Sequence, residues 1–356
     1  MPEQLRGPVE VVGTGLLGTS LGLACRRAGL DVVLTDVSVE HLRTASGLGA
    51  GRPRNSEDRP GLVVVAVPPE HLSAEILDAL RRTDGVVTDV GSIKGEPARR
   101  VGEKASGSAP RYVGGHPMAG SERSGPLAAS AALFDGRPWA VTPHEAAAPA
   151  AVAVVEELAR RCGAVPVRMS PREHDLAVAR TSHLPHLLAV LVAGRLADAP
   201  HGHLTLSGQG VRDVTRVAAG DPRLWEQIVT LNAEALGALL TEVGSELDVL
   251  RDAVASGDRA ALSALLERGV AGTRAIPGKH GEPATPTQPV FVSVPDHPGE
   301  LARLFADAGT AGVNIEDVHI DHDPSRPFGL VELAVEEGRA EVLLDALESR
   351  GWQTHR

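Results

Sequence analysis

The sequence has few cysteines, few lysines and no long uninterrupted apolar run. Its two cysteines, Cys25 and Cys162, fit no metal-binding or disulfide spacing, and we interpret both as small buried apolar residues. No run approaches the roughly 20 apolar residues of a membrane span, and no cleavable signal precedes the first expected strand. These absences predict a cytoplasmic protein with no membrane partner.

Positive charge is scarce as well. Lysine and arginine number 35 against 46 aspartates and glutamates, which gives a formal net charge of −11. Because a nucleic-acid backbone attracts clustered cations, this charge argues against nucleic acid as a partner. Lysine occurs only at Lys94, Lys104 and Lys279, so almost all cations are arginines and each must be judged by its neighbours.

Length and periodicity predict several domains. A chain of 356 residues is too long for one core of ordinary size. Residues 1–169 alternate strand and helix patterns, which is typical of a Rossmann-type parallel sheet covered on both faces. Residues 170–276 keep only helical spacing, 277–288 form a linker rich in proline and glycine, and 289–356 follow a β-α-β-β-α pattern. The expected class is α/β, with an all-helical middle domain and a small α+β domain at the end.

The expected elements also locate the ligand. In the first domain, strands are predicted at 9–12, 31–35, 62–67, 86–89, 111–114, 139–142 and 165–168, and helices at 16–28, 70–82, 94–104 and 147–162. Helices at 173–198, 203–219, 224–254 and 259–269 follow, then strands at 290–294, 312–320 and 330–335 with helices at 300–308 and 339–350. An open α/β sheet binds its ligand beyond the carboxyl ends of its strands. Candidate loops at such ends are Gly13–Gly18, Val67–Pro69, Gly91–Ser92 and the segment around His116.

Three glycines at G-x-G-x-x-G spacing predict a dinucleotide site. Gly13, Gly15 and Gly18 stand between a short β-branched strand and an apolar helix. The first permits the tight turn, the second lets the backbone approach a pyrophosphate, and the third lets the helix lie close to the sheet. The alternative is an ordinary strand-to-helix turn. The strand before the motif and the helix after it favour the dinucleotide.

Asp36 selects the cofactor. It ends the second expected strand about 20 residues beyond the glycines, where a carboxylate accepts a hydrogen bond from a ribose 2′-hydroxyl. The same carboxylate repels a 2′-phosphate, and residues 37–39 bring no cation, so NAD is favoured over NADP. The expected cofactor-binding residues are Gly13, Gly15, Leu16, Leu17, Gly18, Asp36, Val67 and Pro68.

His116, in the glycine-rich segment 114–122, is the best candidate for a catalytic base. Histidine exchanges a proton near neutral pH, and this segment follows a strand that points at the nicotinamide side of the crevice. A capping or buried structural histidine is the alternative. Ser92 follows the neighbouring strand, and its hydroxyl either caps the next helix or binds both substrate and His116. Lys94, two residues later, is compatible with a solvated first-turn residue.

The helical region carries two further polar clusters. His183 and His186 lie three residues apart on one helix face, next to Pro185, which would kink that helix. No third ligand stands at a metal-site spacing, so we expect no metal. Arg212 and Arg216 lie four apart, and a guanidinium binds a carboxylate through two hydrogen bonds. A weak surface ion pair with the intervening aspartate is the alternative.

The order of these motifs resembles that of the prephenate dehydrogenase (TyrA) family. The resemblance covers essentially the whole chain and rests on G-x-G-L-L-G-x-S-L, D-V-G-S-I-K, G-G-H-P-M-A-G-S-E, S-H-L-P-H, R-D-x-T-R and D-P-x-x-W, the last at Asp221–Trp225. It implies an NAD-dependent oxidative decarboxylation of a cyclohexadienol in tyrosine biosynthesis. On this basis His116 would take the proton of the ring hydroxyl, Ser92 would hold that hydroxyl, and Arg216 would bind the side-chain carboxylate with Arg212 close by. Further pocket residues implied are Ser121, Glu122, Ser182, His183, His186 and Trp225.

One departure leaves the substrate open. The family often has a polar residue just before D-P-x-x-W, whereas this chain has Gly220. Prephenate, converted to 4-hydroxyphenylpyruvate, is the leading substrate, and arogenate, converted to tyrosine, is the alternative. A β-hydroxyacid dehydrogenase is a weaker hypothesis, because such enzymes usually have a catalytic lysine in the helical domain and residues 170–276 contain none. The last hypothesis is an NAD-sensing regulator.

The C-terminal segment resembles an ACT domain. Its motifs are V-P-D-H-P-G-E-L from Val294 and G-V-N-I from Gly312. Such domains bind small effectors, usually amino acids, between paired units. The resemblance implies feedback by tyrosine and a homodimer, with Asp296, Pro298, Gly299, Asn314 and Ile315 at the effector site.

Overall fold

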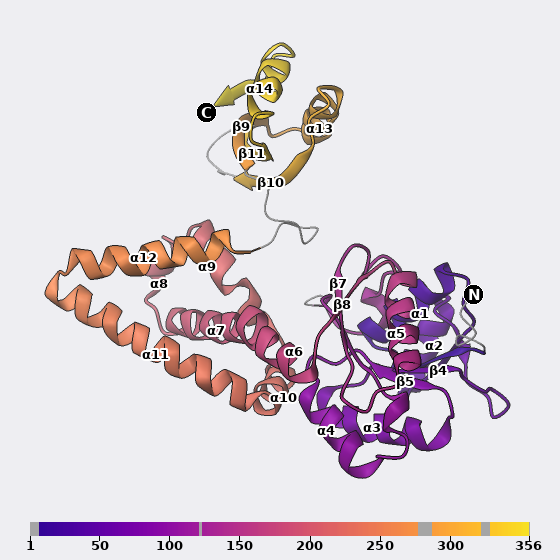
Figure 1. Cartoon of the computed structure of the whole chain (residues 1–356). Helices are drawn as coiled ribbons and strands as arrows, with labels where there is room; N and C mark the ends of the chain where they lie inside the picture. The colour runs from indigo at the N-terminus through magenta and orange to yellow at the C-terminus, as the bar shows by residue number, and fades with distance from the viewer. Residues whose placement is uncertain (1–6, 121–122, 277–286, 322–327, 356) are drawn as a thin grey trace. The chain divides into compact units, whose positions relative to one another are not determined.

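A computed structural model describes residues 7–120, 123–276, 287–321 and 328–355 (Figure 1). The chain forms two compact units, Met1–Ser256 and Gly257–Arg356. The first unit holds the large sheet together with most of the helical region. The second unit holds one long helix and a small antiparallel sheet.

A five-stranded parallel sheet begins the first unit, in the order β3-β2-β1-β4-β5. Its strands are β1 (Val9–Val12), β2 (Val32–Thr35), β3 (Arg52–Pro53), β4 (Leu62–Val65) and β5 (Val86–Asp89). Valine dominates these strands, as expected where both faces of a parallel sheet are buried. This order is that of a Rossmann-like sheet, and it places the ends of β1 and β4 side by side.

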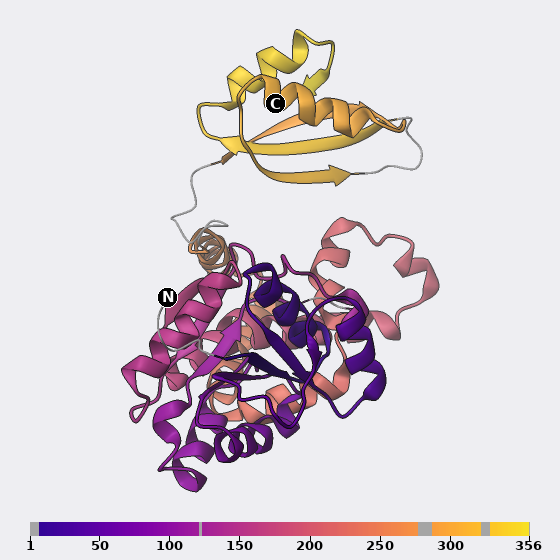
Figure 2. The same ribbon diagram turned by 90° about the vertical axis from the view of Figure 1, so that its right-hand side faces the viewer.

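Helices cover both faces of this sheet (Figures 1 and 2). They are α1 (Leu16–Arg27), α2 (Val39–Gly47), α3 (Pro69–Arg82), α4 (Gly95–Lys104) and α5 (Pro149–Arg161). Side chains of one strand alternate between the two faces: Leu62 and Val64 join a core with α1 and α5, while Val63 and Val65 join one with α3 and α4. The sequence did not predict α2, which begins where Ser38 accepts a hydrogen bond from the His41 N–H.

The two cysteines meet in the first of these cores. Cys25 in α1 and Cys162 after α5 are both fully buried, with their sulfur atoms 3.9 Å apart. Both are free thiols. The interpretation of both residues as buried and apolar is confirmed, and their proximity was not visible in the sequence.

A three-stranded sheet continues the fold, with β6 (Gly114–Pro117) antiparallel to β7 (Pro138–Thr142) and β7 parallel to β8 (Val165–Arg168). The predicted strand at 111–114 is therefore displaced and is not part of an all-parallel sheet. Short 3-10 turns, η2 (Ala109–Arg111) and η3 (Pro126–Ala128), occupy the connections. At η2 the Arg111 guanidinium donates to the carbonyls of Leu80, Thr83 and Gly85 at the end of α3, so this residue is fixed there. The shift places His116 within β6.

The helical region is more broken than its periodicity predicts. It contains α6 (Pro171–Val178), a π-helical turn η4 (Ala179–His183), α7 (Leu184–Ala197), α8 (His201–Leu204), α9 (Gln209–Thr215), η5 (Arg216–Ala219), α10 (Pro222–Leu231) and α11 (Ala233–Ser256). Pro185 lacks an N–H, and the π turn forms just before it. Gly220 is extended, and Asp221 then caps α10 by accepting from the Arg223 N–H, which ends the predicted helix over 203–219.

One helical stretch of this region, Pro171–Ala197, is long and apolar enough to cross a membrane, judged by length and composition alone. By this measure the expectation that no run approaches a membrane span does not hold. Only 28% of its most apolar window is buried within the chain. Helices in the interior of soluble proteins pass the same test, so the observation is weak as an indication of a membrane.

The second unit contains α12 (Arg259–Arg274), β9 (Thr287–Pro295), α13 (Glu300–Thr310), β10 (Ile315–Asp321), β11 (Phe328–Glu336), α14 (Ala340–Glu348) and β12 (Gln353–His355). The strands form one antiparallel sheet in the order β10-β11-β9-β12. Its core joins Val290 and Val292 of β9 to Leu304, Leu343 and Trp352. The short β12 was not predicted, and it completes a β-α-β-β-α-β order.

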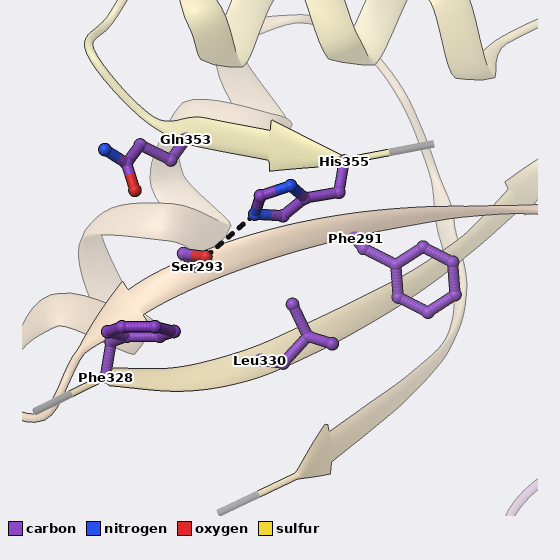
Figure 3. A pocket seen from close by; sticks show the side chains of 6 residues that line it. All are labelled: Phe291, Ser293, Phe328, Leu330, Gln353 and His355. Carbon is purple, nitrogen blue, oxygen red and sulfur yellow. Dashed lines mark hydrogen bonds between the residues drawn. The ribbon is translucent and has the colours of Figure 1, made fainter. Parts of the chain in front are cut away.

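The sheet of this second unit has an open face with a hollow of about 480 Å³ (Figure 3). Its lining is Phe291, Ser293, Phe328, Leu330, Gln353 and His355. The Ser293 hydroxyl and the His355 Nε2 are hydrogen-bonded at 3.0 Å across β9 and β12. None of these residues belongs to the predicted effector site.

Candidate active site

The glycine-rich turn after β1 has the geometry that a dinucleotide requires. Gly13 has φ +95°, and a Cβ there would lie 2.4 Å from the carbonyl oxygen of Ala66. A Cβ on Gly18 would lie 1.8 Å from the carbonyl oxygen of Gly13, so the turn excludes larger residues. At Gly15, by contrast, no described atom lies within 4 Å of such a Cβ. The space above Gly15 is therefore open at the start of α1, where Leu16 and Leu17 begin the helix.

The start of α1 also fits an anion. Gly15 is the N-cap residue, has no capping side chain, and no acidic residue stands in the first turn. The N–H groups and positive dipole end of such a helix favour a pyrophosphate. Val67, which follows β4 and precedes Pro68, lies beside this turn, since its Cγ1 is 3.1 Å from the position of a Cβ on Gly13. Together these residues fit the phosphate part of NAD.

Asp36 is held in place at the end of β2. One oxygen accepts from the Thr14 N–H at 2.5 Å and the Thr14 hydroxyl at 2.7 Å, and the other accepts from the Ser38 N–H at 2.7 Å. A carboxylate has about four acceptor positions, so one remains for a ribose hydroxyl. A hollow of about 460 Å³ on α2, the helix that follows Asp36, is lined by Val39, Glu40, Arg43 and Thr44. These α2 residues were missed because α2 itself was not predicted.

A buried ion pair lies under the candidate catalytic strand. Lys94 is 1% exposed, and its ammonium group contacts the Asp89 carboxylate and donates to the Gly115 carbonyl at 2.8 Å. The Tyr112 hydroxyl donates to the same carboxylate at 2.9 Å. Burial lowers the pKa of Lys94, and it raises the pKa of Tyr112. The interpretation of Lys94 as a solvated residue is wrong, because this ammonium joins β5 to β6 in the interior.

His116 is the first of three side chains that hydrogen bonds join in a line. Its Nδ1 lies 2.8 Å from the Nε2 of His174 in α6, and the His174 Nδ1 lies 2.8 Å from the Asp175 carboxylate. His116 is half-buried, while His174 is 1% exposed. The line therefore connects the candidate base in β6 with the first helix of the helical region.

Asp175 also caps α4. Its two oxygens accept from the Lys94 N–H at 2.9 Å and the Gly95 N–H at 2.7 Å. Of the two interpretations of Ser92, helix capping is therefore wrong, because Asp175 fills that role from 81 residues away. Ser92 is half-buried in the loop between β5 and α4. Its role toward substrate stays a prediction.

Burial sets the charge state of the imidazoles. It lowers the pKa of His116 well below the usual range, with smaller contributions from His174, Lys94 and His183. Burial also lowers the pKa of His174, against the opposing effect of Asp175. The same cause lowers the pKa of His183 to about 4. All three rings are therefore neutral near pH 7, and His116 and His183 are near enough to affect each other.

Two histidines of the π turn and α7 are held by different partners. The Asn232 side-chain amide donates to the Asp175 backbone carbonyl at 2.9 Å and lies 3.1 Å from the His183 Nδ1. His186 stacks on Trp225 of α10, with ring centroids 3.4 Å apart and planes 7° from parallel. Both rings thus have neighbours other than a metal. Among the described residues, no group of three or more potential ligands could hold a metal ion.

Gly220 is explained by this stack. A Cβ at that position would lie 2.5 Å from the Trp225 Nε1 and 3.3 Å from the His186 Cε1. The indole therefore occupies the space that a polar side chain would need. A larger residue at position 220 would require the indole or the imidazole to move.

The remaining predicted residues are only partly placed. Arg212 and Arg216 are exposed on α9 and η5, and within the described residues neither has a carboxylate at ion-pair distance. The aspartate between them instead accepts from the Gln209 amide at 2.8 Å. Ser182 is exposed in the π turn. Ser121 and Glu122 lie outside the described residues.

Two models of one known family match the sheet region and the helical region. The model of the prephenate dehydrogenase nucleotide-binding domain matches residues 21–168, and that of the prephenate dehydrogenase dimerization domain matches residues 170–268. The probable prephenate dehydrogenase NovF of Streptomyces niveus is 38% identical over 355 residues, which cover 96% of this chain and 98% of the relative.

Solved structures agree with these matches. A prephenate dehydrogenase from A. aeolicus, in complex with hydroxyphenyl propionate and NAD+, superposes with a TM-score of 0.68 at 26% identity. An arogenate dehydrogenase from Synechocystis superposes with a TM-score of 0.65, also at 26% identity. Each match covers 75% of this chain and 98% of the solved chain. The chain therefore belongs to the prephenate dehydrogenase family of NAD-dependent oxidoreductases.

Proposed function

We propose that this enzyme oxidatively decarboxylates prephenate to 4-hydroxyphenylpyruvate with His116 as its base. The observation that carries the proposal is the cluster of imidazoles where β6 meets α6 and the π turn. There His116 from β6 lies near His174 and His183. Both of these residues belong to the segment 170–268, which the dimerization-domain model matches. The candidate base of the sheet region therefore lies close to candidate substrate-binding residues of the helical region.

The glycine-rich turn and Asp36 would hold NAD, which accepts the hydride from the ring carbon that bears the hydroxyl. Near pH 7 His116 is neutral, so it can take the proton of that hydroxyl as hydride leaves. Ser92 would hold the hydroxyl in line with the imidazole, within the ~2.6–3.2 Å that proton transfer needs. His116 would return the proton to the ring oxygen as CO2 departs and the ring becomes aromatic.

The helical region would bind the rest of the substrate. Arg216 would bind the side-chain carboxylate through two hydrogen bonds, with Arg212 close by. The absence of a carboxylate partner for either guanidinium among the described residues supports this role. Further pocket residues would be His183, His186 and Trp225, together with Ser182, Ser121 and Glu122. The ring carboxylate must lose its charge as CO2 leaves, so strong binding there would slow the reaction.

Arogenate is the second candidate substrate, because an arogenate dehydrogenase superposes almost as well as a prephenate dehydrogenase. The two differ by a keto and an amino group on the side chain. NADH formation measured with each substrate under the same conditions distinguishes them. We expect the larger kcat/KM with prephenate, and a larger value with arogenate would reverse the assignment.

His116→Asn tests the base directly. Asparagine keeps a hydrogen-bonding side chain but cannot take a proton near neutral pH. We expect kcat to fall by about 10²–10⁴-fold, the usual contribution of a general base, while NAD binding is unchanged. Turnover is followed as NADH absorbance, and NAD binding by titration. Near-normal turnover would remove His116 as the base.

We further propose that the enzyme is a homodimer through its helical region. The family model that matches residues 170–268 describes a dimerization domain. In one copy of the chain α7 exposes a run of large apolar side chains, with Val190, Leu191 and Val192 between 41% and 63% exposed. A second copy would cover this surface.

The second unit would bind an effector, and we propose that it is an ACT domain. Its β-α-β-β-α-β order and the αL conformation of Gly299, φ +95° just before α13, support this assignment. The effector would be an amino acid, in the first place tyrosine, near Asp296, Pro298, Gly299, Asn314 and Ile315. The relative at 38% identity is similar over 96% of the chain, so its similarity extends into this unit.

A further inference from the structure

We propose that Asp175 and His174 fix the tautomer of His116, so that its Nε2 is the unprotonated nitrogen facing the substrate. This inference rests on the proposed role of His116 as the base. It assigns two positioning residues, 58 and 59 positions along the chain from the base. Neither needs to touch substrate, since both act through the hydrogen bonds between them.

Asp175 determines which atom donates and which accepts in each hydrogen bond of this line. Its oxygens accept from the Lys94 and Gly95 N–H groups at the start of α4. Ionised carboxylates are acceptors only, and the positive end of a helix favours the ionised form. The neighbouring imidazole nitrogen, the Nδ1 of His174 at 2.8 Å, must therefore carry its proton and donate.

The tautomers of both histidines then follow. Neutral His174 has one N–H, at Nδ1, so its Nε2 is a lone-pair acceptor. The Nδ1 of His116 lies 2.8 Å from that acceptor and must donate to it. Neutral His116 consequently has its only proton on Nδ1, and Nε2 has the free lone pair. A general base needs this tautomer before substrate arrives.

The same line stabilises the product of proton transfer. When Nε2 takes the substrate proton, the His116 ring becomes positive and its Nδ1–H bond to His174 strengthens. The titratable groups that face this pair are Lys94 and neutral His183 on the His116 side, and Asp175, Lys94 and Asp89 on the His174 side. The Lys94 ammonium disfavours a positive imidazole. The Asp175 carboxylate opposes that effect through His174.

The first test observes the tautomer. Nitrogen-15 spectra of the histidine side chains in the full chain distinguish protonated from unprotonated ring nitrogens, and the His116 signals are those missing from His116→Asn. In the natural protein near pH 7.5 we expect His116 to show a protonated Nδ1 and an unprotonated Nε2. The opposite pattern would overturn the proposal, whether or not any variant folds.

The second test replaces the acceptor. In His174→Phe the ring has no lone pair, so both His116 tautomers become populated and the positive His116 ring loses a hydrogen bond. We expect kcat to fall about 10–100-fold, as for the loss of one hydrogen bond to a charged group. In His174→Gln the side-chain oxygen can still accept from His116, so a smaller loss is expected. His71→Gln, on an exposed histidine of α3, is the matched control and should leave kcat unchanged. NAD affinity should stay unchanged throughout.

The third test removes the charge. Asp175→Asn keeps an acceptor for α4 but no longer stabilises a positive imidazole. In the dependence of kcat/KM on pH, the acid limb of this variant should lie at lower pH than that of the natural protein. A purely structural defect would not cause this shift. If the acid limb does not move in Asp175→Asn, or if His174→Phe turns over normally, the proposed positioning role of Asp175 and His174 is wrong. An inactive His116→Asn would in that case still support His116 as the base. Normal activity in His116→Asn would instead contradict the proposed role of His116 as the base.

Discussion

The ammonium group of Lys94 lies in the interior of the first unit, where charges are costly unless they are paired. Asp89 supplies the opposite charge, and the Gly115 carbonyl and the Tyr112 hydroxyl complete the hydrogen bonds of the pair. Because Gly115 precedes His116, this pair also fixes the strand that carries the base. The position of the His116 imidazole, the proposed base, therefore depends on a buried ion pair.

Lys94→Met should destabilise the fold strongly. Removing one partner of a buried pair leaves an uncompensated charge and costs roughly 3–5 kcal/mol. The free energy of unfolding, measured with denaturant, should fall by that amount. The double variant Lys94→Met/Asp89→Asn is the matched control and should recover part of the loss, because no unpaired charge remains. A loss under about 1 kcal/mol in the single variant would contradict a buried pair.

Arg216→Ala should act on substrate binding. The guanidinium is expected to bind a carboxylate that does not react, so its loss removes binding equally from ground state and transition state. We expect KM to rise about 10–100-fold, as for one lost charge-assisted pair, with kcat changed little. Steady-state kinetics over a wide substrate range measure both constants. An unchanged KM would move this role to Arg212.

At the scale of elements, the helical stretch from α6 to α7 determines how sheet and helices meet. His174 and Asp175 lie in α6 and His183 in the π turn, so one stretch brings all three close to His116 or to the start of α4. The wider π turn changes the helical phase between His174 and His183. Asn232, at the break between α10 and α11, then bonds to both the Asp175 carbonyl and His183.

These neutral histidines should make the fold sensitive to acid. The folded-state pKa of His183 is about 4, below the ordinary 6.5 that applies when unfolded. As pH falls from about 6.5 to about 4, the unfolded state takes up a proton that the folded state does not, so stability falls. The melting temperature should decrease over this range, and His183→Asn should flatten the decrease. An equally steep decrease in that variant would assign the effect to other groups.

At the scale of the whole molecule, every residue proposed to bind cofactor or substrate lies in the first unit. The solved relatives match only 75% of this chain yet 98% of their own length, so that share is enough for a complete dehydrogenase fold. The small unit has its own core around Val290, Leu304 and Leu343.

Deleting residues 288–356 should separate regulation from activity. We expect the shortened chain to keep its kcat within a few-fold, because the proposed cofactor and substrate residues all precede residue 257. Inhibition by tyrosine should disappear, as measured by initial rates at increasing tyrosine. Inhibition that persists would show that tyrosine competes at the active site and that the second unit has another role.

The sequence alone determined the parts that depend on local geometry. The glycine turn, Asp36 and His116 were predicted because a strand, a turn and a helix lie within a few residues of each other, and local sterics dictate which residues fit. The interpretation of Lys94, the strand at 111–114 and the unbroken helices failed, because burial and long-range bonds override local preference.

Only the tertiary structure decided how the site is held together. Asp175 caps a helix that begins 80 residues earlier, His174 binds an imidazole 58 residues away, and Asn232 binds His183 across 49 residues. No periodicity in the sequence signals such pairs, because they exist only once burial has removed water from the polar groups and left each one needing a partner. Local sequence was therefore enough to predict His116 as the base. Its proposed tautomer depends on contacts between residues far apart in the chain.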